Sequence, residues 1–157
     1  MDIMKDLKEA KFLGHPVHMM IIHFPIGLIP VSFVFDLIGL KSNDESFAKA
    51  GYYCLTIGLF SAILSAFFGF VDYLRIPENK TNSRREGLIH MFLNLTWIFI
   101  AAILWGLRLN AIPSNYIESA TEVIITAVAV LIMLISNHFG GDLVIKEGIG
   151  TTFQGHK

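Results

Sequence analysis

Four apolar blocks constrain the fold of this chain more than any other feature of its sequence. Each is roughly 20 residues long and almost free of charge, the length that a helix needs to cross about 30 Å of hydrocarbon. Hydrophobic residues make up 54% of the 157 residues and charged residues only 16%, an apolar excess over ordinary soluble domains. The sequence therefore predicts an all-α integral membrane protein, a single four-transmembrane-helix up-and-down bundle. The expected spans are 17–40, 50–74, 87–109 and 118–139, with an amphipathic or interfacial segment at 1–16 and a cytoplasmic tail at 140–157.

Prolines and glycines predict where these helices bend and end. Pro25 and Pro30 lie inside the first span, where each removes a backbone donor and clashes with the preceding turn, so we expect a kinked helix. Pro77 follows the second span and is expected to stop it. Gly140 and Gly141 are expected to terminate the fourth.

An up-and-down bundle brings most of the histidines to one end. The start of the first span, the end of the second, the start of the third and the end of the fourth share one side in that topology. The opposite end has no histidine, and Asp36 is expected to reach the interface there. The polar residues gathered at the histidine-bearing end are His15, His18, His23, Asp72, Arg75, His90, Asn94, His138 and Asp142.

Lysines and arginines are distributed unevenly between the two ends. Positively charged loops stay in the cytoplasm, so we expect both termini and the histidine-bearing end to be cytoplasmic. The basic residues on that side are Lys5, Lys8, Lys11, Arg75, Lys80, Arg84, Arg85, Lys146 and Lys157, against Lys41, Lys49 and Arg108 on the other.

Composition and motifs exclude several classes of protein. A net charge of −1 lacks the basic excess of a nucleic-acid-binding surface. Cys54 is the only cysteine, which excludes an intrachain disulfide and covalent c-type haem attachment. No nucleophile with an adjacent base, phosphate-cradling loop or pair of carboxylates favours a hydrolase or transferase. The expected partners are the lipid bilayer and a redox protein, with a homo-oligomer left open.

Two histidines lie at matching depth in the predicted spans. His23 is about six residues into the first span and His90 about four into the third, so both should lie roughly 6–9 Å below one surface. The first and third spans are diagonal and parallel, so two inward imidazoles can face each other across the core. This arrangement predicts haem b held between His23 and His90 as axial ligands, in a protein that passes electrons within the membrane.

Further residues could complete this haem site. Asn94 lies one turn from His90 and could orient its ring. Arg75 at the rim could bind the haem propionates. His15 and His18 are expected at the rim or at a second site.

Two other functions fit the same residues. The imidazoles of His18, His23 and His90, with the Asp72 carboxylate, could hold a transition-metal ion. Alternatively, the polar end could dock a cytoplasmic partner of a non-catalytic assembly protein. A position at the membrane interface alone would explain His15, His18 and His138, and Asp72 with Arg75 could simply form an electrostatic lock.

Four ordered motifs resemble a known family. GHPVHMMIIHFPIGL, GFVDYLRIP, GLIHMFLN and FGGDLVIKEGIG are similar to the signatures of a family of predicted bacterial four-span membrane proteins, classified only as a domain of unknown function. The resemblance extends from Gly14 to Gly150. It implies a bacterial inner membrane protein. The positions that match the family's motifs, and that the resemblance implies as site residues, are His15, His18, His23, Asp72, Arg75, His90, Gly140, Gly141 and Asp142.

The resemblance also implies an electron-transfer context and has two departures. The family that this chain resembles includes relatives fused to Rieske-type iron-sulfur domains, which suggests membrane electron transfer for at least part of the family. Relatives often have proline at the position of Met19 and histidine at the position of Glu147. If that tail histidine is a ligand elsewhere, this chain lacks it.

Overall fold

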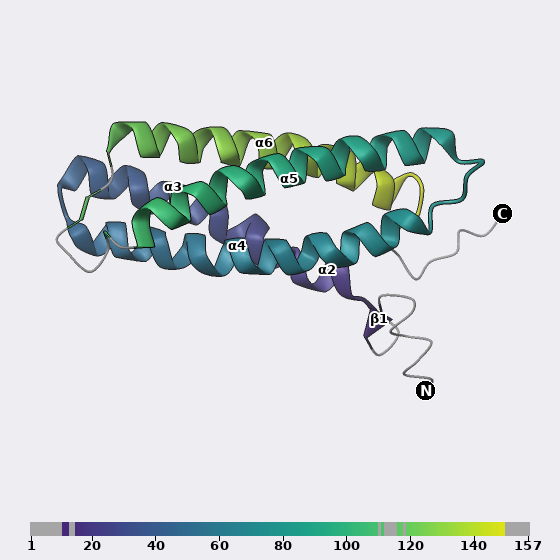
Figure 1. Ribbon diagram of the computed structural model, residues 1–157, viewed down its shortest axis with the longest axis horizontal. Coiled ribbons are helices and arrows are strands. Elements are labelled where there is room, and N and C mark those ends of the chain that lie inside the picture. The colour runs from purple at the N-terminus through teal and green to yellow at the C-terminus, as the bar shows by residue number, and fades with distance from the viewer. Residues whose placement is uncertain (1–10, 13–14, 110, 112–115, 118, 150–157) are drawn as a thin grey trace.

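The computed structural model describes residues 11–12, 15–109, 111, 116–117 and 119–149. Four long helical segments run side by side along the molecule (Figure 1). Each is long and apolar enough to cross a membrane, which confirms the predicted four-span helical bundle. The elements in chain order are β1 (Lys11–Phe12), β2 (His15–Pro16), α2 (Val17–Ile21), α3 (His23–Ser42), α4 (Glu45–Leu74), α5 (Thr81–Leu109) and α6 (Ala120–Ile145).

The first span is broken at Ile22, between α2 and α3. Pro25 has no N–H to donate to the carbonyl of Ile21, so the regular helical ladder is interrupted one turn before the proline. The backbone continues through bonds from Ile22 N to His18 O (3.0 Å) and from Ile26 N to Ile22 O (3.2 Å). The predicted kink at Pro25 is therefore confirmed, whereas Pro30 lies within the continuous helix α3.

Several helices are longer than their sequence predicts. α4 begins at Glu45 because the side chain of Asp44 caps it, accepting from Ser46 N at 2.9 Å. The prediction that Gly140 and Gly141 end the fourth span is wrong, because α6 continues to Ile145. α5 likewise starts at Thr81 rather than near residue 87.

The amino-terminal prediction is only partly covered by the structure. The described residues there form a pair of two-residue strands, β1 and β2, with Phe12 opposite His15. The rest of the amphipathic segment predicted at 1–16 lies outside the described residues, as does the tail beyond residue 149.

The helices form a closed ring around an apolar core. α3 packs on α4, α4 on α5, α5 on α6 and α6 on α3, while α2 packs on α4. We call α2, α3 and α4 the first hairpin, and α5 and α6 the second hairpin. The start of α2, the end of α4, the start of α5 and the end of α6 lie together at one end, the histidine end (Figure 1). The residues at the centre of the core are Ile29, Leu55, Leu59, Ala62, Trp97, Ala101, Leu104, Ala129 and Met133.

The opposite end is fastened by a buried ion pair. Asp36 of α3 and Arg108 of α5 are both fully buried and form two parallel bonds of 3.0 Å. Thr126 donates to Asp36 Oδ2 at 3.1 Å, and Glu122 Oε1 lies 3.7 Å from Arg108 Nε. We call these four residues the clamp. The expectation that Asp36 reaches the interface is therefore wrong, because its charge is neutralised inside the bundle.

Candidate functional site

A cavity of about 790 Å³ lies between the two hairpins at the histidine end. Its walls are mainly apolar and come from α2, α3, α4, α5, α6 and the residues that follow α6. Cofactor pockets have this character: mostly apolar, roughly 300–1,000 Å³, with a few placed polar groups. The polar groups that line it are His18, Asp72, Tyr73, His90, Asn94 and Asn137.

His18 enters the cavity from α2 and is anchored on α4. Its Nδ1 lies 2.9 Å from the carbonyl oxygen of Ser65 and 3.0 Å from the hydroxyl of the same residue. The ring lies against Gly69, where an added Cβ would come within 3.0 Å of the His18 ring. Gly69 therefore permits the close approach that the Ser65 bond requires.

His90 enters the cavity from α5 and is anchored on α6 in the same way. Its Nδ1 lies 2.8 Å from the carbonyl oxygen of Ser136 and 3.1 Å from the Ser136 hydroxyl. That hydroxyl donates to the carbonyl of His90 at 3.0 Å. A Cβ on Gly140 would lie 2.6 Å from the His90 ring. Gly140 therefore makes room for this ring from a position inside α6.

The hydrogen bonds determine which ring nitrogen of each histidine carries the proton. A carbonyl oxygen only accepts, so Nδ1 must be the protonated nitrogen in both His18 and His90. For His90, Asn94 Nδ2 also lies 3.0 Å from Nε2, and Trp97 Nε1 donates to Asn94 Oδ1 at 2.7 Å. Because the indole N–H only donates, the Asn94 amide must present its NH₂ group to His90. Nε2 is therefore the acceptor nitrogen, the atom that would bind a metal.

Comparison with known families agrees with this architecture. Residues 14–153 match the model of a family described as "Predicted membrane protein (DUF2231)". The chain belongs to this DUF2231 family. No curated protein and no solved structure matches it. The family description therefore places the DUF2231 chain in a membrane and leaves its activity to be inferred from the site.

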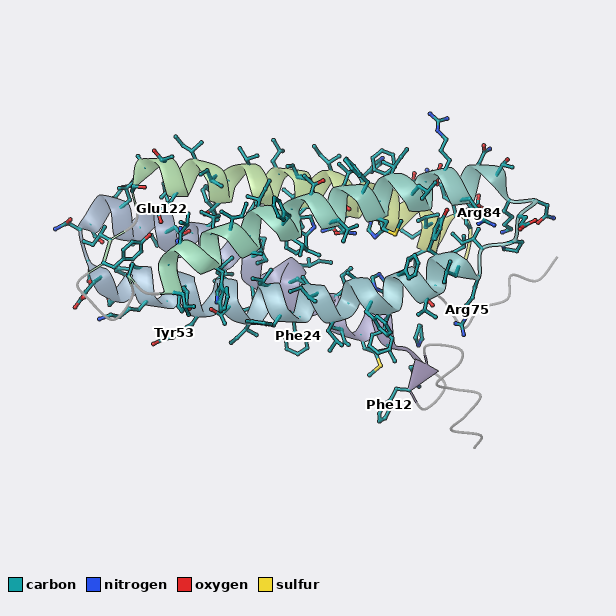
Figure 2. The ribbon with its side chains drawn as sticks, viewed as in Figure 1. Phe12, Phe24, Tyr53, Arg75, Arg84 and Glu122 are labelled. Carbon is teal, nitrogen blue, oxygen red and sulfur yellow. The ribbon has the colours of Figure 1, made fainter. Side chains whose placement is uncertain are left out.

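Among the residues that the structure describes, three further histidines of this DUF2231 protein lie outside the cavity. His23 is exposed, next to Phe24, whose side chain projects away from the bundle (Figure 2). The predicted facing of His23 and His90 across the core is therefore wrong: the buried face of the first span carries Pro25 and, seven residues earlier, His18. His15 and His138 are also exposed.

Asp72 and Arg75 lie at the rim of the cavity in the DUF2231 chain. Asp72 lines it, and Arg75 Nη1 lies 3.6 Å from Asp72 Oδ1. Among the described residues, no group of three or more histidine, cysteine or acidic side chains is arranged to hold a metal ion. The structure thus gathers His18, His90 and Asp72 around one space without bringing His23 to them.

The segment after α6 is tied to the start of α5 beside the cavity. Glu147 Oε2 accepts hydrogen bonds from the Ser83 hydroxyl at 2.9 Å and from Lys80 Nζ at 3.3 Å. These bonds hold the pKa of Glu147 below its ordinary value. Ile149, which follows Glu147 closely, lines the cavity. Glu147 therefore ties the segment that carries Ile149 to the start of α5, at the position where the resemblance suggests histidine in relatives.

Sequence reasoning missed the two serines that anchor the histidines. Ser65 and Ser136 are small residues of apolar helices, which are usually read as packing positions. A signal is present in the sequence: each serine is followed by Phe-Gly at the same spacing, in SAFFG and SNHFG. Comparison of the second and fourth spans could therefore have found both anchors.

Proposed function

We propose that this DUF2231 protein binds haem b in the cavity between its hairpins, between the imidazoles of His18 and His90, and passes electrons within the membrane. The observation that carries the proposal is the common anchoring of the two rings. In both, Nδ1–H is bonded to a serine carbonyl, which leaves Nε2 as the lone-pair nitrogen. Metal-binding histidines are held in this way by the bond of their other nitrogen.

The cavity fits the chemistry of a haem. Its volume of about 790 Å³ and its largely apolar walls suit a porphyrin, and imidazole nitrogens are common axial ligands of haem iron. Bound haem would supply one-electron redox chemistry. The chain's own residues would orient the ligands, exclude water and set the polarity of the site.

Two arginines at the histidine end would be the partners of the haem propionates. Arg75 and Arg84 both lie at the histidine end (Figure 2). Arg75 is paired with Asp72 at the cavity rim, and the Arg84 guanidinium lies 5.8 Å from the centre of the Tyr73 ring. Guanidinium groups bind carboxylates with paired, charge-assisted hydrogen bonds.

The site is proposed to face the cytoplasm of a bacterial inner membrane. Arg108 is buried in the clamp and so no longer counts as a loop charge. Lys41 and Lys49 then remain as the basic residues of the other side, which strengthens the charge asymmetry. A reporter fused after Lys157 should be active only if that end is cytoplasmic, and a periplasmic reporter would contradict this orientation.

A visible spectrum of the detergent-purified protein tests the haem site. We expect a Soret band and reduced α bands after expression with haem supplied. The double variant His18→Ala/His90→Ala should be colourless. Its matched control, His23→Ala/His138→Ala, removes two exposed imidazoles and should keep the wild-type spectrum.

The other outcomes assign the site differently. A colourless wild-type protein that holds stoichiometric metal, lost in the inward double variant, would overturn haem in favour of a transition-metal ion. A protein that holds neither would favour a docking role. Loss of the spectrum in the outward double variant, with the inward one unchanged, would restore His23 as the ligand.

A further inference from the structure

The two hairpins contain equivalent half-sites. Each has an imidazole on its first span and a serine and a glycine, one helical turn apart, on its second. The serine follows the histidine by 47 residues in the first hairpin and by 46 in the second. The distances from Nδ1 to the serine carbonyl, 2.9 and 2.8 Å, are also nearly equal. The cavity therefore lies between two copies of one arrangement.

One residue makes the two half-sites chemically unequal. The residue four positions after His90 is Asn94, whose amide donates to Nε2 at 3.0 Å. The residue four positions after His18 is Ile22, an apolar wall of the cavity. Within the described part of the chain, no hydrogen bond reaches Nε2 of His18. Nε2, the nitrogen that would bind the iron, therefore accepts a hydrogen bond in the half-site of His90 and is available to a ligand in the half-site of His18.

The Asn94 amide is held firmly over His90. Trp97 is buried and its indole N–H bonds Asn94 Oδ1 at 2.7 Å, which prevents the amide from turning its oxygen to the ring. For His90 to bind a metal, it must give up the Asn94 bond and leave that N–H without its acceptor. Loss of a buried partner weakens such a binding equilibrium by roughly ten- to a hundredfold.

We propose that His18 is the permanent axial ligand and that Asn94 keeps His90 from binding the iron tightly, so that one iron face accepts a neutral diatomic ligand. This inference rests on the proposed haem site. On that face His90 and Asn94 form the polar wall next to the bound diatomic molecule. Binding of such a ligand to ferrous iron forms one iron–ligand bond and transfers no electron.

Carbon monoxide added to the dithionite-reduced, haem-loaded protein tests this inequality. We expect the wild-type Soret band to shift on addition of carbon monoxide. Asn94→Leu should free His90 to bind the iron and weaken carbon monoxide binding by about tenfold or more. Thr96→Leu is the matched control, since Thr96 lies on the same helix as Asn94, bonds the carbonyl of Phe92 and is not among the residues that line the cavity, and it should bind like the wild type. Trp97→Phe, which frees the amide to turn, should weaken binding in the same direction.

Single histidine variants separate this inference from the haem proposal. We expect His18→Ala to lose haem and His90→Ala to retain it. A wild-type protein that holds haem in a six-coordinate low-spin form unreactive to carbon monoxide would overturn the inference and leave the haem site standing. Retention of haem in His18→Ala but not in His90→Ala would reverse the roles. A protein that takes up no haem overturns both proposals.

Discussion

The two ends of the bundle use their polar residues in opposite ways. At the clamp end, Asp36 of α3 is bonded to Arg108 of α5 and Thr126 of α6, and an added Cβ on Gly51 of α4 would lie 2.4 Å from Asp36 Oδ1. All four spans thus meet at one carboxylate. At the histidine end, the serine anchors of His18 and His90 stay within their own hairpins. At the clamp end, side-chain bonds connect spans of both hairpins. At the histidine end, the bonds of His18 and His90 connect the spans within each hairpin, and the cavity lies between the hairpins.

This difference indicates how the fold can be rigid and still hold space. Burial of charge is costly unless each charge is neutralised and hydrogen-bonded, so the clamp tolerates little displacement of any helix. At the histidine end, each imidazole is bonded through Nδ1 to a serine carbonyl, which leaves its other ring nitrogen for the cavity. The clamp therefore fixes the spacing of the spans at its own end, whereas a cavity lies between the hairpins at the histidine end.

Removal of Arg108 should have the largest effect on stability. In Arg108→Met the buried Asp36 carboxylate loses its cation, and we expect the free energy of unfolding in detergent to fall by about 3–5 kcal/mol. Lys49→Met is the control at the same end, because the Lys49–Glu45 pair (3.2 Å) is exposed. Its expected change is less than about 1 kcal/mol. Thermal or denaturant unfolding followed by circular dichroism measures both.

A double variant isolates the pair itself. Asp36→Asn/Arg108→Met removes both charges and keeps an acceptor for Thr126, so it should recover at least part of the stability lost in Arg108→Met. Equal losses in Arg108→Met and Lys49→Met, or a double variant no more stable than Arg108→Met, would show that the clamp does not fasten the bundle.

Two adjacent glycines at the histidine end provide the next test. A Cβ at Gly140 would lie 2.6 Å from His90, whereas Gly141 has nothing within 4 Å. Gly140→Ala should displace the imidazole from Ser136 and destabilise the protein by about 1–3 kcal/mol. Gly141→Ala, in the same helix, should be neutral or stabilising by up to about 1 kcal/mol. The melting temperatures of the two variants check this, and equal values would mean that His90 is not packed as described.

The sequence predicted the parts of this molecule that depend on local pattern. Apolar length alone predicts the four spans, and Pro25 predicts the break in the first. The inward side of the first span was predicted wrongly, although helical spacing contains the signal. The buried residues Pro25, Ile29 and Ser32 define one face of the helix, and His18, seven residues before Pro25, falls on that face, whereas His23 falls on the opposite side.

Other features depend on contacts between spans and were not visible in any one of them. Arg108 lies in the last turn of an apolar helix and has the pattern of an interfacial charge. Its burial requires Asp36, which is 72 residues distant in the chain. Gly140 has the pattern of a helix terminator, and its role depends on the His90 ring from another helix. Long-range pairing, rather than local propensity, decided both.

Hydrogen exchange should show that the two ends differ in local stability. α2 has no buried residue, whereas α3 buries Ile29, Ser32 and Asp36 along its length. We expect amides of α2 to exchange at least about tenfold faster than those between Ile29 and Asp36. Mass spectrometry of the detergent-purified protein measures this. In Arg108→Met the difference should shrink, and slower exchange in α2 than in α3 would contradict the comparison.

Two exposed carboxylates, one at each end, should give the smallest effects. Hydrogen bonds lower the pKa of Glu147, chiefly from Ser83 and then Lys80, and that of Asp44, chiefly from the Ser46 side chain. A lowered folded-state pKa contributes stability above the ordinary value, and this contribution is lost as the pH falls through the folded-state pKa. The ordinary values are 4.5 for Glu147 and 3.8 for Asp44.

The melting temperature of Glu147→Gln should therefore lie slightly below that of the wild type at neutral pH and approach it as the pH falls below 4.5. Asp44→Asn should converge with the wild type at lower pH, because its ordinary pKa is lower. Because both carboxylates are exposed, solvent screens their interactions, and both differences in melting temperature should be small. Because Glu147 ties the residues after α6 to α5 beside the cavity, acid should also lower the protection of the Ile149 amide, which is its exchange rate relative to the intrinsic rate at the same pH. Loss of the Asp44 cap should affect only the start of α4. A difference between Glu147→Gln and the wild type that is independent of pH would show that this tether is not ionic.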